Sequence, residues 1–417
     1  MAAKIKHILL LTALFLFLGA AVGSLVWILI FIINGGTQLL WQNLPACLGL
    51  QDSLLYRITV CICGGLLIGF WQKKHGDIPE DMEHVFKSVK EKGGYPYERL
   101  HIIAVAALLP LIFGGALGPE AGLTGIIAGL CTLIAAKLKT YKESSAEMSE
   151  TGLAIALNTV FNAPLFGIIA QLEPDASEKY RDKFLRKRNR IFCYVLGTLG
   201  GLAAMSLWGR LWGRDGGLPR LENLHAAGLT EWKWLLPLII IGIAAAAFNQ
   251  LMKWSAAKIN VKFGTNKLLS CAAVGLVVAL AGYYLPLSIY SGELQIELLD
   301  KNWAQYTFII LVVSALGKLL MANLCFEWGW KGGVIFPHIF AGIALGFAFA
   351  GLIGLEASFA AAAVTGALCG ALMKRPLAVT ALLMICFPAA YIPPILAAAF
   401  AASQAGKFIE GKNRVGD

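Results

Sequence analysis

Long apolar stretches run along almost the whole chain, and they limit its fold more than any other feature. The first stretch, residues 8–33, reads ILLLTALFLFLGAAVGSLVWILIFII and follows a basic start at Lys4, Lys6 and His7. A helix that crosses a bilayer needs about 20 mainly apolar residues, whereas the apolar core of a signal peptide has only about 7–15. Residues 8–33 are longer than such a core and lack a convincing cleavage site, so we predict a retained membrane span.

The composition supports a membrane protein and excludes several other classes. Of the 417 residues, 58% are hydrophobic and 14% are charged, against about 45–50% and about 25% in soluble domains. These values exclude a soluble enzyme, a disordered regulator and a secreted disulfide scaffold. The nine cysteines lie mostly inside apolar stretches, and the six histidines show no metal-ligand spacing such as HExxH. We therefore expect no metal site and no cofactor.

The net charge is +10, and the basic residues gather in short loops between apolar stretches. These loops contain Lys73 and Lys74, residues 137–142 and residues 179–190. Short basic loops are typical of the cytoplasmic side of a multi-pass membrane protein. The charge therefore indicates orientation in a lipid bilayer, and we expect no nucleic-acid partner.

The remaining apolar stretches are often short and broken by glycine and proline. They cover 54–71, 102–117, 121–136, 152–172, 191–212, 234–258, 268–288, 306–326, 334–354, 357–373, 376–387 and 391–405. Helices that stop halfway through a membrane are tolerated only where their ends are buried in protein or line a cavity. We therefore predict an all-α integral membrane protein with several re-entrant or discontinuous helices. In this prediction residues 1–417 form a single transmembrane domain, with a short cytosolic tail at 406–417.

Two pairs of similar motifs indicate a duplication within the chain. Pro164 lies in an Asn-Ala-Pro-Leu sequence and Pro376, 212 residues later, lies in Lys-Arg-Pro-Leu. Gly118 and Gly332, 214 residues apart, each lie in a glycine-rich turn before an apolar stretch. Broken helices at matching positions of two halves often mark a transport site, although chance similarity between glycine-rich helices is an alternative. The predicted halves are residues 54–210 and 266–405.

A carboxylate stands at the start of one apolar stretch, in the segment 115–122, GALGPEAG. Charged groups inside membranes are costly and usually functional, and the N-terminus of a helix stabilises an anion. The same helix end would bind a free anion if the Glu120 side chain moved away. We therefore interpret Glu120 as a gate that competes with an anion, with a simple capping role as the alternative. The neighbouring residues that would hold the anion are Gly118, Pro119, Ala121 and Gly122.

A second glycine-rich turn lies in the segment 330–338, WKGGVIFPH. Glycines before a helix leave backbone N–H groups accessible, and proline suits the first turn of a helix. We predict an anion-binding helix start formed by Val334, Ile335 and Phe336, with a structural Gly-Gly turn as the alternative. His338 could titrate near neutral pH and relay protons, although a histidine beside an apolar helix is more often a packed residue.

Two further segments carry polar residues at the ends of apolar stretches. The segment 75–80, HGDIPE, follows a span and precedes a short polar helix, and by itself it indicates an interfacial cap. The segment 161–167, FNAPLFG, lies in the apolar stretch 152–172, and Glu173 closes an apolar helix there at the interface. Taken alone, neither segment points to a function.

In order and spacing, these four segments resemble the motifs of the CLC family of chloride channels and proton-coupled chloride exchangers. FNAPLFG and KGGVIFP are the most specific part of the resemblance, which runs from about residue 50 to about residue 405. The resemblance implies an inverted repeat of tilted, re-entrant and broken helices around a mid-membrane anion path, with Glu120 at the position of the gating glutamate. It also implies a homodimer with one pore per subunit, and a short prokaryotic member in a bacterial inner membrane.

Several positions depart from the pattern of that family. The selectivity serine corresponds to Gly76, so backbone groups would have to replace its hydroxyl. The inner proton-transfer glutamate corresponds to Pro174, which cannot carry a proton and argues against proton coupling. Glu173 and His338 are the candidates for another proton relay. The backbone groups in place of the serine belong to Gly76, Asp77 and Ile78.

We predict CLC-like transport of small inorganic anions, most directly chloride, and no enzymatic activity. An intramembrane enzyme would need a nucleophile with a base, an aspartate pair or HExxH, and the sequence has no such set. Two alternatives stay open. One is a proton-coupled exporter of fluoride or another halide, since fluoride-exporting members of the family also lack the serine. The other is an inverted-repeat transporter of an organic substrate.

Overall fold

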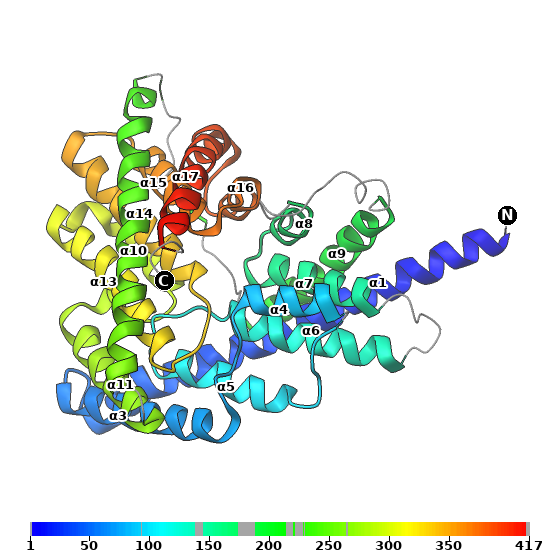
Figure 1. Cartoon of the computed structure of the whole chain (residues 1–417), viewed down its shortest axis with the longest axis horizontal. Coiled ribbons are helices and arrows are strands. Elements are labelled where there is room, and N and C mark those ends of the chain that lie inside the picture. Colours follow the sequence, from blue (N-terminus) through cyan, green and yellow to red (C-terminus); the bar gives the residue numbers. More distant parts are fainter. Residues whose placement is uncertain are drawn as a thin grey trace. The chain divides into compact units, whose positions relative to one another are not determined.

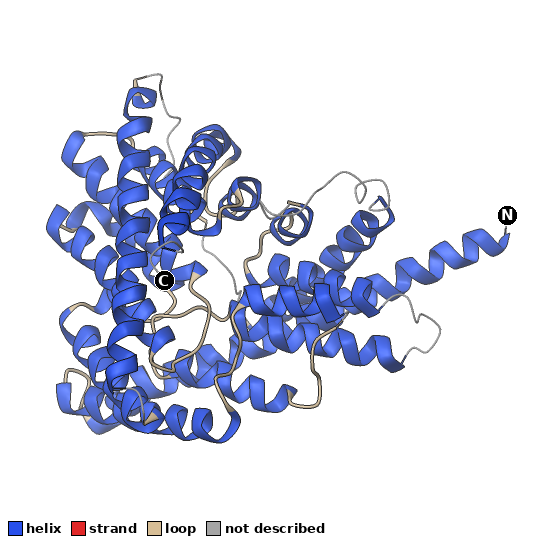
Figure 2. Ribbon diagram, viewed as in Figure 1, coloured by secondary structure: helices blue, strands red, loops and turns tan. Residues whose placement is uncertain are grey.

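The structure is a computed structural model in which every regular element of the described residues is a helix (Figure 2). The described residues are 2–92, 94–137, 145–173, 188–213, 220–221, 228, 230–263 and 266–413. The predicted all-α class is therefore confirmed. The predicted proton position Pro174 and the basic loop residues 138–142 and 179–187 lie outside the described residues.

The helices follow one another through the chain, and most of them are labelled in Figure 1. The first series comprises α1 (Ala2–Gln38), α2 (Leu44–Leu48), α3 (Leu54–His75), α4 (Met82–Lys92), α5 (Leu100–Ile112), α6 (Glu120–Lys137), α7 (Ser145–Val160), α8 (Phe166–Leu172) and α9 (Arg188–Trp212). The second comprises α10 (Leu235–Phe263), α11 (Lys267–Tyr284), α12 (Glu293–Asn302), α13 (Phe308–Glu327), α14 (Ile335–Ile353), α15 (Ala357–Met373), α16 (Pro376–Leu383) and α17 (Ile392–Asn413).

Seven stretches of the described residues are long and apolar enough to cross a membrane. They are Thr12–Leu48, Leu54–His75, Ile191–Trp212, Glu231–Val261, Lys267–Tyr284, Phe308–Glu327 and Ile335–Ile353. There are also four shorter apolar helices among the described residues, Leu100–Ile112, Glu120–Ile134 and Thr151–Val160 between the spans and Ala357–Met373 after the last of them. This mixture of full spans and helices too short to cross is the one that the sequence predicts, and the predicted first span 8–33 lies within α1.

The helix lengths follow a similar order in two consecutive parts of the chain. From α3 to α9 the helices have 22, 11, 13, 18, 16, 7 and 25 residues. From α11 to α17 they have 18, 10, 20, 19, 17, 8 and 22 residues. The fourth helix of each series begins at one of the two predicted anion-binding segments, because α6 starts at Glu120 and α14 at Ile335. The parallel supports the duplication of residues 54–210 and 266–405, which we keep as a proposal.

The chain divides into two compact units. Unit 1 comprises residues 1–35, 79–108 and 119–217, and unit 2 comprises residues 36–78, 109–118 and 218–417. In unit 1, α7 packs between α6 and α9. In unit 2, α3 and α11 lie side by side (Figure 1), and α14 packs against α13 and α15. In the segment of α14 that could span a membrane 83% of the residues are buried, against 28% in α3 and 39% in α11.

Small residues set the close approach of α3 and α11 in unit 2. A Cβ atom added to Gly65 of α3 would lie 2.3 Å from the carbonyl oxygen of Cys271 in α11. In turn, a Cβ atom added to Gly275 of α11 would lie 2.2 Å from the carbonyl oxygen of Cys61 in α3. Close backbone contact through small residues is a common way for helices to associate in lipid. This contact holds the middle of α3 against α11, and one of the predicted anion segments follows the end of α3.

The apolar stretch 152–172 contains two helices. Helix α7 ends at Val160 and α8 begins at Phe166, so the FNAPLFG segment forms the joint between two short helices. Asn162 adopts a left-handed backbone with φ of 55°, and proline two residues later provides no backbone N–H for a helix. The side-chain oxygen of Asn158 accepts a hydrogen bond from the Gly167 N–H at 2.6 Å and so ties the two helices together.

Candidate functional site

The helix α6 begins at Glu120, as the sequence predicts, and the residue is only 1% exposed. The Leu123 N–H donates to the carbonyl oxygen of Pro119 at 3.0 Å, so the helical turn starts directly after the Gly-Pro pair. The last glycine of the segment has a packing role, because a Cβ atom on Gly122 would lie 2.2 Å from the Cβ atom of Ala107 in α5. The sequence thus places a buried carboxylate at a helix N-terminus, where the helix dipole favours an anion.

The helix α14 begins at Ile335, directly after the predicted glycine turn. The turn pairs with the segment before α6 through a short antiparallel bridge. The Gly118 N–H donates to the Gly333 carbonyl at 2.8 Å, and the Gly333 N–H donates to the Gly118 carbonyl at 2.8 Å. Each bridge residue lies two positions before a helix start, at Glu120 or Ile335.

Glycine is needed beside this bridge because the two segments run very close together. A Cβ atom on Gly332 would lie 2.9 Å from the Cβ atom of Leu117 and 3.3 Å from the Gly118 carbonyl oxygen. The first turn of α14 then presents backbone N–H groups toward its N-terminal end, which is the usual construction of an anion-binding helix start. The backbone just before α6 and the turn just before α14 therefore meet at Gly118 and Gly333, which both lie in unit 2.

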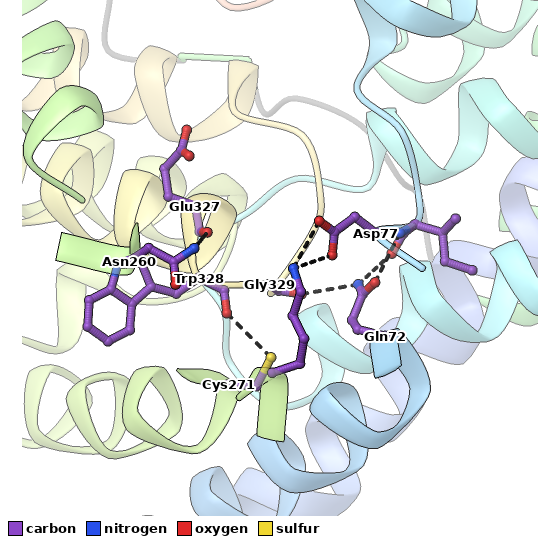
Figure 3. A network of polar contacts seen from close by, with 9 residues as sticks. Gln72, Asp77, Asn260, Cys271, Glu327, Trp328 and Gly329 are labelled. Carbon is purple, nitrogen blue, oxygen red and sulfur yellow. Dashed lines mark hydrogen bonds and ion pairs between the residues drawn. The ribbon is translucent and has the colours of Figure 1, made fainter. Parts of the chain in front are cut away.

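The third predicted segment follows α3 and is held by a side chain of that helix. Gly76 adopts a φ of 90°, which favours glycine, and its N–H donates to the Gln72 carbonyl at 2.9 Å. The Ile78 N–H donates to Gln72 Oε1 at 3.0 Å, and Gln72 Nε2 donates to the Ile78 carbonyl at 2.6 Å (Figure 3). Of the three backbone N–H groups predicted to replace the serine hydroxyl, those of Gly76 and Ile78 thus donate to Gln72. The backbone N–H of Asp77 is therefore the one of the three that we consider as a donor to an anion.

The side chain of Asp77 forms an ion pair with the first residue of α11. Lys267 Nζ lies 2.7 Å from Asp77 Oδ1 and 2.9 Å from Asp77 Oδ2 (Figure 3). The Asp77 and Lys267 side chains are 51% and 39% exposed, so the pair contributes little to stability. It does fix which way the Asp77 carboxylate points, toward α11.

Three side chains from three helices bind the turn that leads from α13 toward α14. Successive carbonyl groups, those of Glu327, Trp328 and Gly329, act as the acceptors (Figure 3). Asn260 Nδ2 of α10 donates to Glu327 at 2.8 Å, and Cys271 Sγ of α11 donates to Trp328 at 3.4 Å. Gln72 Nε2 of α3 donates to Gly329 at 3.1 Å.

Gln72 was not among the predicted site residues, although its side chain contacts the predicted segment 75–80 and the residue directly before the predicted segment 330–338. The amide binds both polar groups of Ile78 and also the carbonyl of Gly329, and the side chain is 3% exposed. The only sequence signal is a polar residue in the last turn of an apolar span, four positions before Gly76. Such a residue is rarely without a function, but its partners are distant in sequence.

The two candidates for a proton relay differ in their surroundings. His338 is 8% exposed and its Nε2 lies 3.3 Å from Oδ1 of Asn249, which also accepts from Asn323 Nδ2 at 2.8 Å. These contacts support the packed alternative for His338. Glu173 caps the C-terminus of α8, and its N–H donates to the Ile169 carbonyl at 2.7 Å. A proton relay through either residue stays a prediction.

Comparison with known proteins decides the family. Residues 59–407 match the voltage-gated chloride channel family. The chain belongs to the CLC family. The matched region begins inside α3 and ends inside α17, so it contains all four motifs that resemble this family. The family assignment made from these motifs is confirmed.

Relatives of this CLC chain include bacterial proteins named for ion transport. YfeO of Escherichia coli O139:H28 is 26% identical over 336 residues, which are 78% of this chain and 75% of that protein. YfeO of Shigella boydii serotype 4 is 27% identical over the same share of each chain. Both relatives therefore match the CLC chain across most of the two sequences.

Solved structures show the same fold as this CLC chain. A slow cyanobacterial Cl⁻/H⁺ antiporter matches with a TM-score of 0.78 at 18% identity, over 95% of this chain and 94% of that chain. A CLC-type fluoride/proton antiporter matches with 0.72 at 20% identity, over 95% and 96%. A eukaryotic CLC transporter matches with 0.71 at 16% identity, over 96% and 73%. Together with the seven apolar spans, these likenesses confirm a multi-pass membrane protein with the CLC fold.

Proposed function

We propose that this CLC protein carries small inorganic anions, chloride first among them, along a path in each subunit of a homodimer. We also propose that it lies in a bacterial inner membrane, because its relatives named for ion transport are bacterial proteins. The single observation that carries the proposal is a buried carboxylate, Glu120, at the first residue of α6, within a chain that matches the CLC family. Transport of anions is the function of that family. The choice of chloride as the main anion is the more specific part of our proposal.

The proposed path uses backbone dipoles to replace the hydration shell of the anion. The N-termini of α6 and α14 carry partial positive charge, and both start directly after glycine-containing turns. Partial charges bind an anion firmly enough to admit it and weakly enough to release it. We propose Val334, Ile335 and Phe336 as anion-binding residues at the start of α14. We propose Gly118, Pro119, Ala121 and Gly122 as anion-binding residues at the start of α6.

Glu120 acts as the gate in this proposal. A carboxylate buried at a helix N-terminus occupies the place that suits an anion, so the two compete for one site. Protonation removes the negative charge of the side chain and favours its departure from that site. Anion flux should therefore rise as the pH falls.

Coupling to protons is the part of the proposal in which the chain differs from its structural neighbours. Two of these neighbours are proton antiporters, one for chloride and one for fluoride. The resemblance to the family motifs assigns the inner proton position to Pro174, and proline has no titratable group. We therefore propose uncoupled movement of chloride. Proton-coupled export of fluoride is the second candidate, because the chain shares 20% identity and the fold with the fluoride/proton antiporter.

A series of small anions in liposomes tests the choice of transported anion. The purified protein is reconstituted into vesicles loaded with chloride, fluoride, bromide or nitrate, and efflux is followed with an electrode for each anion. We expect chloride to leave at least about tenfold faster than fluoride, which corresponds to about 1.4 kcal/mol of discrimination. Faster fluoride efflux in the same preparation would replace chloride by the second candidate. Vesicles without protein give the background.

A further inference from the structure

We propose that Gln72 is a positioning residue that joins the loop after α3 to the turn before α14 and thereby sets how tightly the protein binds its anion. The inference rests on the proposed function, because it assumes that these two segments line an anion path. It goes beyond that function, since Gln72 belongs to none of the motifs that resemble the CLC family. The residues concerned all lie in unit 2.

The geometry of the Gln72 amide carries the inference. Its oxygen accepts from the Ile78 N–H at 3.0 Å, while its nitrogen donates to the Ile78 carbonyl at 2.6 Å and to the Gly329 carbonyl at 3.1 Å. An amide nitrogen has two hydrogens to donate, so both are used on these carbonyls. One buried group therefore holds both polar groups of a loop residue and one carbonyl of a second segment (Figure 3).

These bonds matter for an anion because carbonyl oxygens repel it. With Gln72 present, the oxygens of Ile78 and Gly329 are turned toward Nε2 and their negative charge is partly compensated. Without the amide, either peptide group could rotate, and a carbonyl could then face the anion in place of an N–H group. A buried carbonyl group without a hydrogen-bond donor is costly in free energy, so the backbone would rearrange to give it another donor. In this proposal Gln72 thus keeps the negative oxygen ends of two carbonyl dipoles directed away from the anion.

A purely structural role for Gln72 would give a different result. The turn before α14 is also bound by Asn260 at Glu327 and by Cys271 at Trp328, so it keeps two side-chain contacts when Gln72 is changed. If Gln72 only stabilised the fold, its loss would reduce the amount of active protein and leave the affinity of the active fraction unchanged. If it positions the two segments, the affinity itself must change.

The test is the substitution Gln72→Met, which keeps the length of the side chain and removes all three hydrogen bonds. Chloride efflux from liposomes is measured against internal chloride concentration, and the amount of folded protein is taken from gel filtration. We expect the half-saturation concentration to rise about tenfold, and the maximal flux per folded protein to change less. Gln72→Asn is the milder variant, because the shorter amide no longer reaches Gly329, and the same direction is expected if the methionine variant does not fold.

Two matched variants serve as controls. Gln295→Met makes the same change at another buried glutamine of unit 2, whose Nε2 donates to the Ile289 carbonyl at 3.1 Å. Asn260→Leu removes a side-chain bond to the same turn, at Glu327, without touching the loop at Ile78. Both controls should keep the half-saturation concentration of the unmodified protein within about twofold, a difference of about 0.4 kcal/mol.

The outcomes separate this inference from the proposed function. An unchanged half-saturation concentration in a folded Gln72 variant overturns the positioning role, while chloride transport by the unmodified protein still stands. An equal rise in Gln72→Met and Asn260→Leu also overturns it, because the effect then comes from a loosened turn. If the unmodified protein moves no small anion at all, the proposed function fails and the inference fails with it.

Discussion

Glu120→Gln is expected to give a protein whose anion flux no longer depends on pH. In the unmodified protein the carboxylate is 1% exposed at the first residue of α6, and its protonation opens the site in our account. The flux should then rise by up to about tenfold per pH unit while a single carboxyl group titrates. Glutamine has the shape of the protonated acid and cannot ionise, so the variant should show the high flux at every pH. Efflux from liposomes, measured over a range of pH, checks this expectation.

Glu356→Gln is the matched control for the gating experiment. Glu356 is also a carboxylate at a helix N-terminus, because it caps α15 and accepts from the backbone N–H groups of Ser358 and Phe359. It lies outside the motifs that resemble the CLC family, so its variant should keep the pH profile of the unmodified protein. A pH profile that survives unchanged in Glu120→Gln would show that Glu120 is not the gate.

Asn158→Leu is expected to cause the largest loss of stability among the variants considered. Asn158 is fully buried in unit 1 and joins three helices. Its Nδ2 donates to Thr198 Oγ1 of α9 at 2.6 Å, and its Oδ1 accepts from the Gly167 N–H of α8 at 2.6 Å. Leucine has a similar volume and leaves both partners buried without this side chain, which costs about 1–3 kcal/mol for each. We expect the free energy of unfolding to fall by about 3 kcal/mol, seen as a lower Tm in detergent.

A double-mutant cycle identifies which bond is responsible. Thr198→Val removes the hydroxyl that Asn158 contacts in α9 and leaves the bond to Gly167 in place. The double variant should lose less stability than the two single variants together, because both remove the same Asn158–Thr198 bond. A Tm of Asn158→Leu equal to that of the unmodified protein would contradict the role of this residue in joining α7, α8 and α9.

The sequence predicts well those features that depend on neighbouring residues. The start of α6 at Glu120 follows from the glycine and proline directly before it, and the start of α14 at Ile335 follows from the two glycines before it and the proline in its first turn. The membrane spans follow from apolar length, and the short helices follow from its interruption. The family follows from four motifs in order, and the match over residues 59–407 confirms it.

Features that depend on contacts between distant residues are harder to predict. The break between α7 and α8 needs the bond from Asn158 to Gly167, nine residues away, and the apolar pattern continues straight through the break. The bridge between Gly118 and Gly333 is indicated in the sequence only by the two glycine-rich turns, whose separation is similar to that of the other repeated motif. Gln72 has almost none, because its partner Gly329 is 257 residues away.

The central claim is that this CLC chain moves chloride without coupling it to protons, and paired flux measurements test it most directly. Liposomes containing the purified protein receive an outward chloride gradient, and an electrode for chloride and an electrode for pH record both fluxes at once. Our account predicts chloride efflux with no matching uptake of protons into the vesicles. Proton movement in a fixed ratio to chloride would contradict the uncoupled mechanism, and the absence of any anion flux would contradict the function itself.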